Sequence, residues 1–309
     1  MNYQHAFHAG NFADVHKHVV LTRILEHLRA KAAAFRVIDT HAGAGRYDLL
    51  GPQASRAGEW RDGIARVFPM RRSGTGGPGN TAAADGALAL LAPYLDIVAS
   101  LNRDQELRLY PGSPLIAKAL LRPQDRLIAC ELEPKAATSL KAALRGDPRA
   151  KVLPIDGWLG LNANVPPKER RGLVLIDPPY EEADDFQRLS SAFAHAHRKW
   201  PTGLYLSWYP IKTREATDAL ARRLRRLGVA KIMRCELTFG KQRADLGLIG
   251  SGLILANPPY PLEPELHIVL PVLARLLGPS PSSNPSSNPS PSPNPSPNPS
   301  YRIDWLARE

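Results

Sequence analysis

The residues Asp177-Pro178-Pro179-Tyr180 combine a carboxylate, a stiff backbone and an aromatic ring at four consecutive positions. The Asp177 carboxylate and the Pro178 carbonyl both accept hydrogen bonds from an amino group such as adenine N6, and so can aim its lone pair at an electrophile. Tyr180 can stack on a base, a contact worth roughly 1–3 kcal/mol. We therefore predict that Asp177, Pro178 and Tyr180 are catalytic. The alternative is an acidic residue before a rigid turn that has no chemical role.

These residues need a strand to hold them, and one directly precedes them. The run Leu173–Ile176 is continuously apolar, as in a buried parallel strand. Pro178 cannot continue a central strand, so the chain turns at Asp177, and ligands of open α/β sheets bind at this carboxyl edge. A near-copy, Asn257-Pro-Pro-Tyr260, ends a later strand. We interpret it as a structural turn, because the catalytic turn should follow the fourth strand.

A second group of candidates belongs to an interrupted dinucleotide-type motif. The strand Phe35–Asp39 leads into Thr40-His-Ala-Gly43-Ala-Gly45, whose glycines Gly43 and Gly45 allow a ligand to approach the backbone. A helix should follow at once, but the segment Arg46–Leu109 intervenes. The motif resumes at Pro111-Gly-Ser113-Pro114, where we expect Ser113 to be the N-cap of a helix over 115–121.

Acidic residues then follow two further strands at the same sheet edge. The strand Arg126–Cys130 ends at Glu131, which we expect to bond the ribose hydroxyls of a nucleoside cofactor. An exposed strand-end carboxylate is the alternative. The strand Ala150–Ile155 ends at Asp156-Gly157, where the carboxylate could accept a hydrogen bond from the cofactor's adenine. The motif predicts an α/β protein with a Rossmann-like sheet.

The interruption divides the chain. We predict a Rossmann-like domain over residues 1–45 and 110–309, and an inserted helical subdomain over 46–109. Helix-like patterns in the insert cover Trp60–Phe68 and Ala83–Leu101, around a Gly-rich loop at Ser73–Asn80. The other expected elements are helices over 134–144, 186–200 and 214–227 and strands over 203–208, 231–239 and 252–256.

The N-terminal part is unusually rich in histidine. Residues 1–13 are polar and aromatic and are expected to form an ordered arm, followed by a helix from Asp14 to about Ala34. His16 and His18 lie on different faces of that helix, and no cysteine or carboxylate cluster completes a ligand set. We therefore predict no metal site.

The C-terminal part carries two segments of biased composition. The helix over 214–227 is rich in arginine, which is typical of a solvated face; contact with RNA phosphates is the alternative. Residues 279–300 are almost wholly Pro, Ser and Asn, so we expect a disordered loop. Tyr301, Ile303 and Trp305 then alternate as in a last edge strand.

The composition points to an anionic partner. The 309 residues include 40 Lys+Arg and 29 Asp+Glu, a net charge of +11, which favours nucleic acid first and a membrane surface second. Cys130 and Cys235 form neither a disulfide framework nor a metal-ligand spacing. The segment Met1–His5 lacks a signal-peptide core, and no apolar run approaches about 18 residues. We expect a cytoplasmic protein with no membrane contact, acting as a monomer.

Taken together, these motifs resemble those of the bacterial 23S ribosomal RNA adenine-N6 methyltransferase J family. The resemblance covers the chain from end to end apart from the Pro/Ser/Asn repeat, which departs from the family and puts only the C-terminal edge in doubt. The N-terminal signature is far more specific than Asp-Pro-Pro-Tyr alone. The matching segments are Tyr3-Gln-His-Ala-Phe-His-Ala-Gly-Asn-Phe-Ala-Asp-Val-His-Lys-His18, Asp39-Thr-His-Ala-Gly-Ala-Gly-Arg-Tyr47, Tyr110-Pro-Gly-Ser-Pro114, Asp177-Pro-Pro-Tyr-Glu181 and the turn Ser207-Trp-Tyr-Pro210.

The resemblance implies a class I methyltransferase fold with a small inserted subdomain, S-adenosylmethionine as cofactor, and adenine 2030 of 23S rRNA as target. It implies that Asp177 is the catalytic acceptor and also borders the cofactor, that Tyr3 meets the RNA, and that Lys17 lies close to RNA and cofactor. The residues that it implies for the cofactor pocket, beside Gly43 and Gly45, are His18, His41, Ser113, Glu131, Asp156 and Gly157.

Two other functions fit parts of the pattern. A DNA adenine-N6 methyltransferase shares the Asp-Pro-Pro-Tyr chemistry, but it needs a domain that recognises duplex sequence, and the insert over 46–109 is small for one. A non-catalytic RNA-binding protein on a methyltransferase scaffold is the other. The acids at three strand ends, Glu131, Asp156 and Asp177, argue against it.

Overall fold

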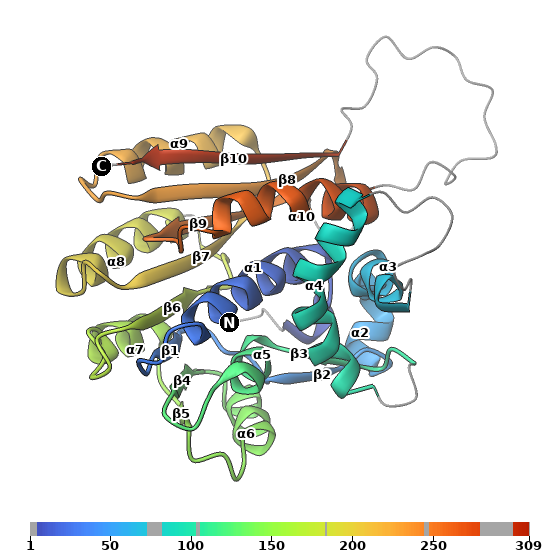
Figure 1. Cartoon of the computed structure of the whole chain (residues 1–309), viewed down its shortest axis with the longest axis horizontal. Coiled ribbons are helices and arrows are strands. Elements are labelled where there is room, and N and C mark those ends of the chain that lie inside the picture. Colours follow the sequence, from blue (N-terminus) through green and yellow to red (C-terminus); the bar gives the residue numbers. More distant parts are fainter. Residues whose placement is uncertain are drawn as a thin grey trace.

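The computed structural model describes residues 5–72, 82–102, 106–182, 184–243, 247–278 and 299–308. Its centre is an eight-stranded sheet with the order β10-β8-β9-β7-β6-β1-β4-β5 (Figure 1). The strands of this sheet are β1 (Arg36–Asp39), β4 (Arg126–Cys130), β5 (Ala150–Leu153), β6 (Gly172–Ile176), β7 (Leu204–Ile211), β8 (Ile232–Arg243), β9 (Leu248–Ala256) and β10 (Ser300–Ala307).

The strands β5-β4-β1-β6-β7 are parallel, and β9, β8 and β10 continue the sheet with antiparallel pairings. The chain order of the parallel part is that of the Rossmann sheet, which brings the ends of β1, β4 and β6 to one edge. The predicted α/β class is confirmed, as a mixed α/β fold with a large, mostly parallel sheet.

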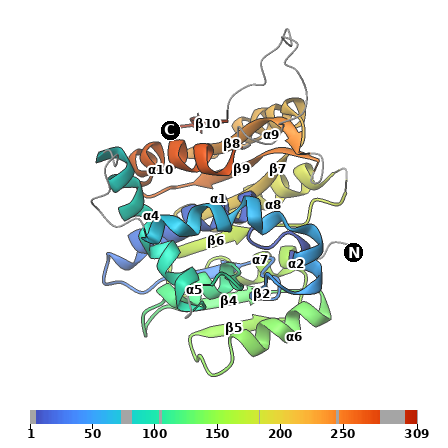
Figure 2. The same cartoon turned by 90° about the vertical axis from the view of Figure 1, so that its right-hand side faces the viewer.

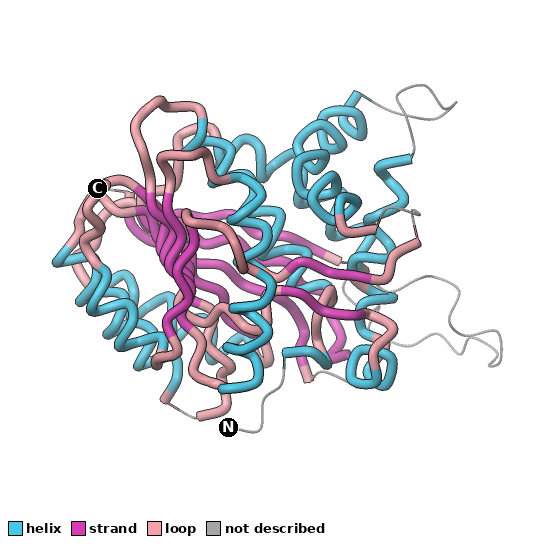
Figure 3. Tube along the Cα trace, turned by 90° about the horizontal axis from the view of Figure 1, so that it is seen from below, coloured by secondary structure: helices cyan, strands magenta, loops and turns pink. Residues whose placement is uncertain are grey.

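Helices cover both faces of the sheet (Figures 2 and 3). Alternate strand residues explain this: Leu173 and Leu175 pack in one core cluster and Val174 and Ile176 in the other. The helices of the first cluster are α1 (Phe12–Arg29), α5 (Ser113–Leu120) and α10 (Leu262–Leu277). Those of the second cluster are α7 (Gly157–Asn164), α8 (Asp185–Lys199) and α9 (Arg214–Arg225), while α6 (Pro134–Ala143) packs on β5.

The segment over 46–109 is helical, as predicted, and its ends meet in a two-stranded ribbon, β2 with β3. Residues of α3 and α4 share the core cluster of α1 and α10, so the insert packs directly on the sheet's covering helices. The Gly-rich loop at 73–80 lies outside the described residues, and the division into domains stays a prediction. The elements are β2 (Arg46–Asp48), α2 (Pro52–Ala57), a 3-10 helix at Glu59–Asp62, α3 (Ile64–Val67), a 3-10 helix at Phe68–Arg72, α4 (Ala82–Ser100) and β3 (Leu109–Pro111).

Helix starts differ from the predicted ones for a local reason. Helix α1 begins at Phe12 rather than Asp14, because the Asn11 side chain accepts a hydrogen bond from the Asp14 amide and caps the helix. Ser113 was expected to be an N-cap, and this is wrong: Gly112 is the N-cap of α5. The Ser113 hydroxyl donates to Asp39 instead, at 2.7 Å.

Near the C-terminal half, two expectations need correction. Ser207 to Pro210 are part of strand β7 and not a turn. The strands expected over 231–239 and 252–256 are longer, because β8 continues to Arg243 and β9 begins at Leu248. Helix α10, which no pattern in the sequence analysis predicted, packs in the first core cluster.

The end of the chain agrees with the prediction of an edge strand, since β10 pairs only with β8 among the described strands. The Pro/Ser/Asn loop at 279–300 lies outside the described residues except for Pro299 and Ser300. No helix in the described part is long and apolar enough to cross a membrane.

The near-copy of the Asp177 motif, Asn257-Pro-Pro-Tyr260, is confirmed as a structural turn. Strand β9 runs antiparallel to β7, and Ala256 pairs with Tyr205 at the start of β7. Asn257 therefore lies at the sheet edge opposite to Asp177. Its amide donates to the carbonyls of Pro201 and Gly203, both at 2.8 Å, and so fixes the start of β7.

Candidate active site

Asp177 follows β6 at the carboxyl edge, as predicted, with 13% of its side chain exposed. A buried ammonium holds it in place: Lys17 of α1 donates one hydrogen bond to Asp177 Oδ2 and another, of 2.9 Å, to Asp14 Oδ1. Burial alone would lower the pKa of Lys17, but the two carboxylates raise it above its usual value. Lys17 is therefore a permanent cation between two acids.

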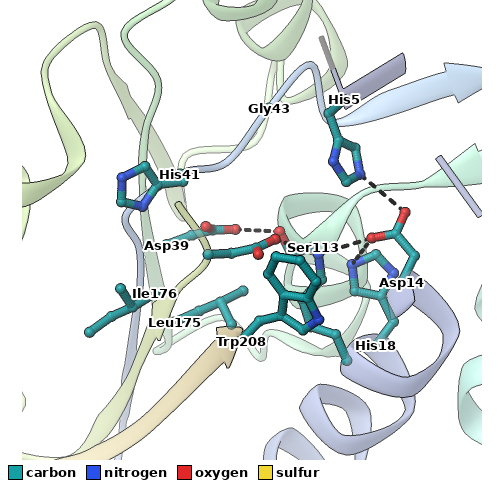
Figure 4. Close-up of polar contacts among 12 residues, drawn as sticks. His5, Asp14, His18, Asp39, His41, Gly43, Ser113, Leu175, Ile176 and Trp208 are labelled. Atoms are coloured by element: carbon teal, nitrogen blue, oxygen red, sulfur yellow. Dashed lines mark hydrogen bonds and ion pairs between the residues drawn. The ribbon is translucent and has the colours of Figure 1, made fainter. Parts of the chain in front are cut away.

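Asp14 completes this group from within the first turn of α1. Its second oxygen accepts from the Gly10 amide at 2.9 Å and from His5 Nε2 at 3.1 Å (Figure 4). Burial would raise the pKa of Asp14, but Lys17, His5 and His18 hold it well below its usual range. The N-terminal segment is thereby tied to the ion pair beneath Asp177.

A cavity of about 260 Å³ opens beside Asp177. The cavity has an aromatic wall, formed by Tyr180 and Trp208. Trp208 can reach it because β7 extends further than β6: the pairing of the two strands ends at Ile176 with Ser207, while β7 continues to Ile211. Trp208 thus stands next to the Asp177 turn. The lining residues are His5, His8, Asn11, Ala13, Asp14, Lys17, Asp177, Pro179, Tyr180, Glu181, Trp208, Pro210, Lys212 and Leu248.

Tyr180 is fixed more tightly than a freely stacking ring. Its backbone has a φ of 51°, in the left-handed region that residues other than glycine rarely adopt. Its hydroxyl donates to the Trp208 carbonyl at 2.6 Å, and its ring meets Trp208 edge-on, with centroids 5.6 Å apart. The Asp177 turn and β7 therefore form one rigid wall.

Asp39 Oδ1 at the end of β1 and His18 Nε2 on α1 are both buried and have no hydrogen-bond partner. Ser113 donates to the other oxygen of Asp39, and His18 Nδ1 lies 2.8 Å from the Tyr110 hydroxyl. Figure 4 shows Ser113 bonded to Asp39, and His18 next to Asp14. Buried polar atoms are normally paired, so these two indicate a polar ligand.

Burial dominates the titration of both residues. It raises the pKa of Asp39 to about 7, with the nearby Asp177 adding to the rise and the Ser113 hydrogen bond opposing it. Burial lowers the pKa of His18 to about 3, so this histidine is neutral near neutral pH. Asp39 Oδ1 can accept a hydrogen bond from a polar ligand, and the neutral ring of His18, whose Nε2 lies 4.0 Å from Asp14 Oδ1, can donate one.

The predicted glycines have the backbone that the motif requires. Gly43 and Gly45 have φ values of 63° and 78°, which a side chain would strain. The Gly43 amide donates to Glu131 Oε2 at 2.8 Å, so the loop lies against the end of β4. Glu131 also accepts from the Glu133 amide at 2.8 Å.

Asp156, Gly157 and His41 meet around the start of α7. Asp156 Oδ1 accepts from the amides of Trp158 and Leu159, both at 3.0 Å, and so acts as the N-cap of this helix. A Cβ on Gly157 would lie 2.1 Å from the Thr40 carbonyl, so only glycine lets α7 approach β1. His41 is half-buried, and burial lowers its pKa to about 4. Its ring meets Trp158 edge-on, away from His18.

The structure thus gathers most predicted residues at one edge, in two groups: the Asp177 pocket and the Asp39–His18 side. Two RNA predictions stand apart. Tyr3 lies outside the described residues. Lys17 is only 4% exposed, so it lines the inner wall of the pocket and is not part of an outer surface that RNA could contact. Among the described residues, no group of three His, Cys, Asp or Glu is placed to hold a metal ion.

Sequence reasoning missed three residues of this site. Asp39 ends β1 as Glu131 ends β4, so the rule that identified Glu131 would have found it. Asp14 lies three positions before Lys17, the spacing of a helical ion pair. Trp208 lies in the matching segment Ser207-Trp-Tyr-Pro210, but no spacing pointed to its role, because its position depends on how far β7 extends beyond β6.

Comparisons with known proteins agree with this site. The family described as "Ribosomal RNA large subunit methyltransferase D, RlmJ" matches residues 32–286. The chain is 41% identical over 280 residues to ribosomal RNA large subunit methyltransferase J of Escherichia coli K12, covering 91% of this chain and 95% of that protein. It is 39% identical over 280 residues to the protein of the same name from Haemophilus influenzae, covering 90% and 95%.

A solved structure is also similar over nearly the whole length. The crystal structure of protein LPL1258 from Legionella pneumophila superposes with a TM-score of 0.79 and 34% identity, covering 96% of this chain and 98% of that one. These matches confirm the family that the motifs resemble. The chain belongs to the ribosomal RNA large subunit methyltransferase J family and is an enzyme.

Proposed function

We propose that this enzyme transfers the methyl group of S-adenosylmethionine to N6 of adenine 2030 in 23S rRNA. The observation that carries the proposal is the place of Asp177: its carboxylate borders a pocket with an aromatic wall and lies at the same sheet edge as Asp39. A base and a charged cofactor can therefore meet at this carboxylate. The relatives' names, which refer to large-subunit rRNA, support the substrate class.

The target amine is held by Asp177. Its Oδ2 receives Lys17, and no described residue donates to Oδ1, which is left for the N6 hydrogens. The Pro178 carbonyl is the second acceptor on this turn. An amine held by two acceptors turns its lone pair away from them, so positioning and electrostatics supply most of the rate. Asp177 then receives the proton that the methylated amine releases.

The cofactor supplies the electrophilic methyl on a sulfonium. Asp39 Oδ1 would accept from its amino group and His18 Nε2 would donate to its carboxylate, which pairs both orphaned atoms. Glu131 would take the ribose hydroxyls, and Asp156, with Gly157 and His41, would flank the adenine. Gly43, Gly45 and Ser113 shape the loop between these groups. The family resemblance implies the roles of His18, His41, Ser113, Glu131, Asp156 and Gly157, and the places of Glu131 and Asp156 directly after β4 and β5 support them.

The RNA base would enter the pocket out of its stack, as enzymes that act on bases require. Tyr180 and Trp208 form the face against which it lies. The net charge of +11 favours binding to the phosphate backbone. Tyr3 and Lys17 remain the predicted RNA contacts, Lys17 from inside the pocket.

The test is transfer of labelled methyl from S-adenosylmethionine to a 23S rRNA fragment that contains adenine 2030, with duplex DNA as the competing substrate. Asp177→Ala should lose about 100-fold or more in kcat while calorimetry still detects cofactor binding. Asn257→Ala is the matched control in the duplicate motif at the opposite edge, and should keep the wild-type kcat. Full activity of Asp177→Ala would refute the role of Asp177, and preferential methylation of the DNA would refute the substrate.

A further inference from the structure

A buried hydrogen-bonded chain runs from helix α1 to the aromatic wall of the pocket. The Trp208 indole N–H donates to Ser251 Oγ at 3.0 Å, and Ser251 Oγ lies 3.0 Å from His16 Nδ1. His16 Nε2 lies 3.2 Å from Cys235 Sγ. The chain connects α1, β9, β8 and β7, and none of its members belongs to the catalytic turn.

One direction in this chain is fixed by chemistry. An indole N–H only donates, so Ser251 Oγ accepts from Trp208. His16 is fully buried and burial lowers its pKa to about 3, so it is neutral and carries a single ring proton. That proton either lies on Nε2, with the Ser251 hydroxyl donating to Nδ1, or lies on Nδ1 and is donated to Ser251 Oγ. Both arrangements keep Ser251 Oγ as the acceptor for the indole, so the chain fixes the rotamer of Trp208.

We propose that Ser251, oriented by His16, is a positioning residue for the target base. It holds the Trp208 indole in the plane that the base must meet. Trp208 borders the cavity directly, whereas Ser251 and His16 are 0% exposed and touch neither cavity nor substrate. The proposal rests on the proposed function, because it takes the base in this pocket to be the methyl acceptor.

The Trp208 peptide unit also holds the Tyr180 ring, so the orientation of the indole sets how the two rings of the wall lie relative to each other. Its carbonyl accepts the Tyr180 hydroxyl at 2.6 Å, so the wall consists of two rings joined to one peptide unit. If Ser251 is lost, the indole can turn while the Tyr180 ring stays. The expected result is a wall in which the two rings no longer keep the fixed edge-on arrangement that the base must fit.

The first test is Ser251→Ala with the full-length protein. We expect KM for the RNA fragment to rise so that kcat/KM falls about tenfold, the effect of one lost hydrogen bond at a binding surface, while the Kd for S-adenosylmethionine stays within twofold. The control is Thr217→Val on α9, which also removes a buried hydroxyl but one away from Trp208, and it should leave KM unchanged. A kcat/KM within twofold of wild type for Ser251→Ala would overturn the proposal.

The second test separates positioning from general loosening. Trp208→Phe keeps an aromatic wall but has no indole N–H, so adding Ser251→Ala to it should change kcat/KM by less than twofold. In the ¹⁵N spectrum of wild type, the Trp208 indole resonance, assigned by its loss in Trp208→Phe, should shift in Ser251→Ala but not in Thr217→Val. An unchanged resonance, or a Ser251→Ala effect that persists in Trp208→Phe, would overturn the proposal.

A third measurement distinguishes failure of this proposal from failure of the proposed function. Adenosine 5′-monophosphate, titrated into wild type, should move the Trp208 indole resonance, and Ser251→Ala should weaken that binding. If this holds while no methyl reaches the rRNA fragment, the proposed function fails and the positioning role stands. If methyl is transferred but the indole does not respond to the nucleotide, the positioning role is wrong.

Discussion

The ammonium of Lys17 donates a hydrogen bond to the carboxylate of Asp177, across 160 positions of sequence. Lys17 belongs to the second turn of α1 and Asp177 to the turn after β6, and Asp14 accepts a second hydrogen bond from the same ammonium. One buried cation thus neutralises one of the two acids and orients the other. The N-terminal helix is part of the active site for this reason.

Removing the Lys17 cation should lower the stability of the protein. Lys17→Met leaves Asp14 and Asp177 without their shared counter-ion, so we expect the free energy of unfolding to fall by about 3–5 kcal/mol. Urea denaturation measures it. Arg29→Met is the control on the same helix: Arg29 pairs with Glu26 at the surface, and its loss should cost about 1 kcal/mol or less. Equal losses in the two variants would contradict the buried ion pair.

Asp39 should make the free protein less stable as the pH rises. Its pKa is about 7 when folded and 3.8 as a free side chain, so the folded state binds the proton more tightly. That contribution is fully present below about pH 4 and is lost as the pH rises through about 7, a change on the order of 4 kcal/mol. Asp39→Asn cannot ionise. The difference in unfolding free energy between wild type and Asp39→Asn should therefore shift against wild type between these pH values, and a constant difference would refute the prediction.

Two glycines should respond in opposite directions to alanine. A Cβ on Gly63 would lie 2.0 Å from the Gly10 carbonyl oxygen, so Gly63→Ala must push the insert away from the start of α1, and we expect a loss of about 1–3 kcal/mol. Gly86 lies inside α4, and its Cβ would meet only Ile268 at 3.7 Å. Gly86→Ala should stabilise the protein by about 0.5–1 kcal/mol. Thermal denaturation of both variants checks this, and a stabilising Gly63→Ala would contradict the tight contact.

The sequence was sufficient wherever the signal was local. The apolar runs before Glu131 and Asp177 predicted β4 and β6 with their observed ends, because buried parallel strands read as continuous apolar runs bounded by turn residues. Alternation at every second residue, at Tyr301, Ile303 and Trp305, predicted the last edge strand. Order along the chain distinguished Asp177 from Asn257, and the antiparallel direction of β9 gives the physical reason.

Features that depend on tertiary contacts could not be predicted from local patterns. Serine is a common N-cap residue, but the Ser113 hydroxyl donates a hydrogen bond to the buried Asp39 instead. A lysine on a helix is most often exposed, yet Lys17 is buried because Asp14 and Asp177 both accept its hydrogen bonds. The Trp208–Ser251–His16 chain joins residues from three distant segments, and no spacing in the sequence connects them.

The central claim is that Asp177 directs a methyl group to N6 of one rRNA adenine. The most direct measurement is to map N6-methyladenine in 23S rRNA from cells that lack this gene and carry either the wild-type gene or Asp177→Ala on a plasmid. We predict N6-methyladenine at position 2030 with the wild-type gene only. Methylation of that position by Asp177→Ala, or its absence with the wild-type gene, would contradict the account.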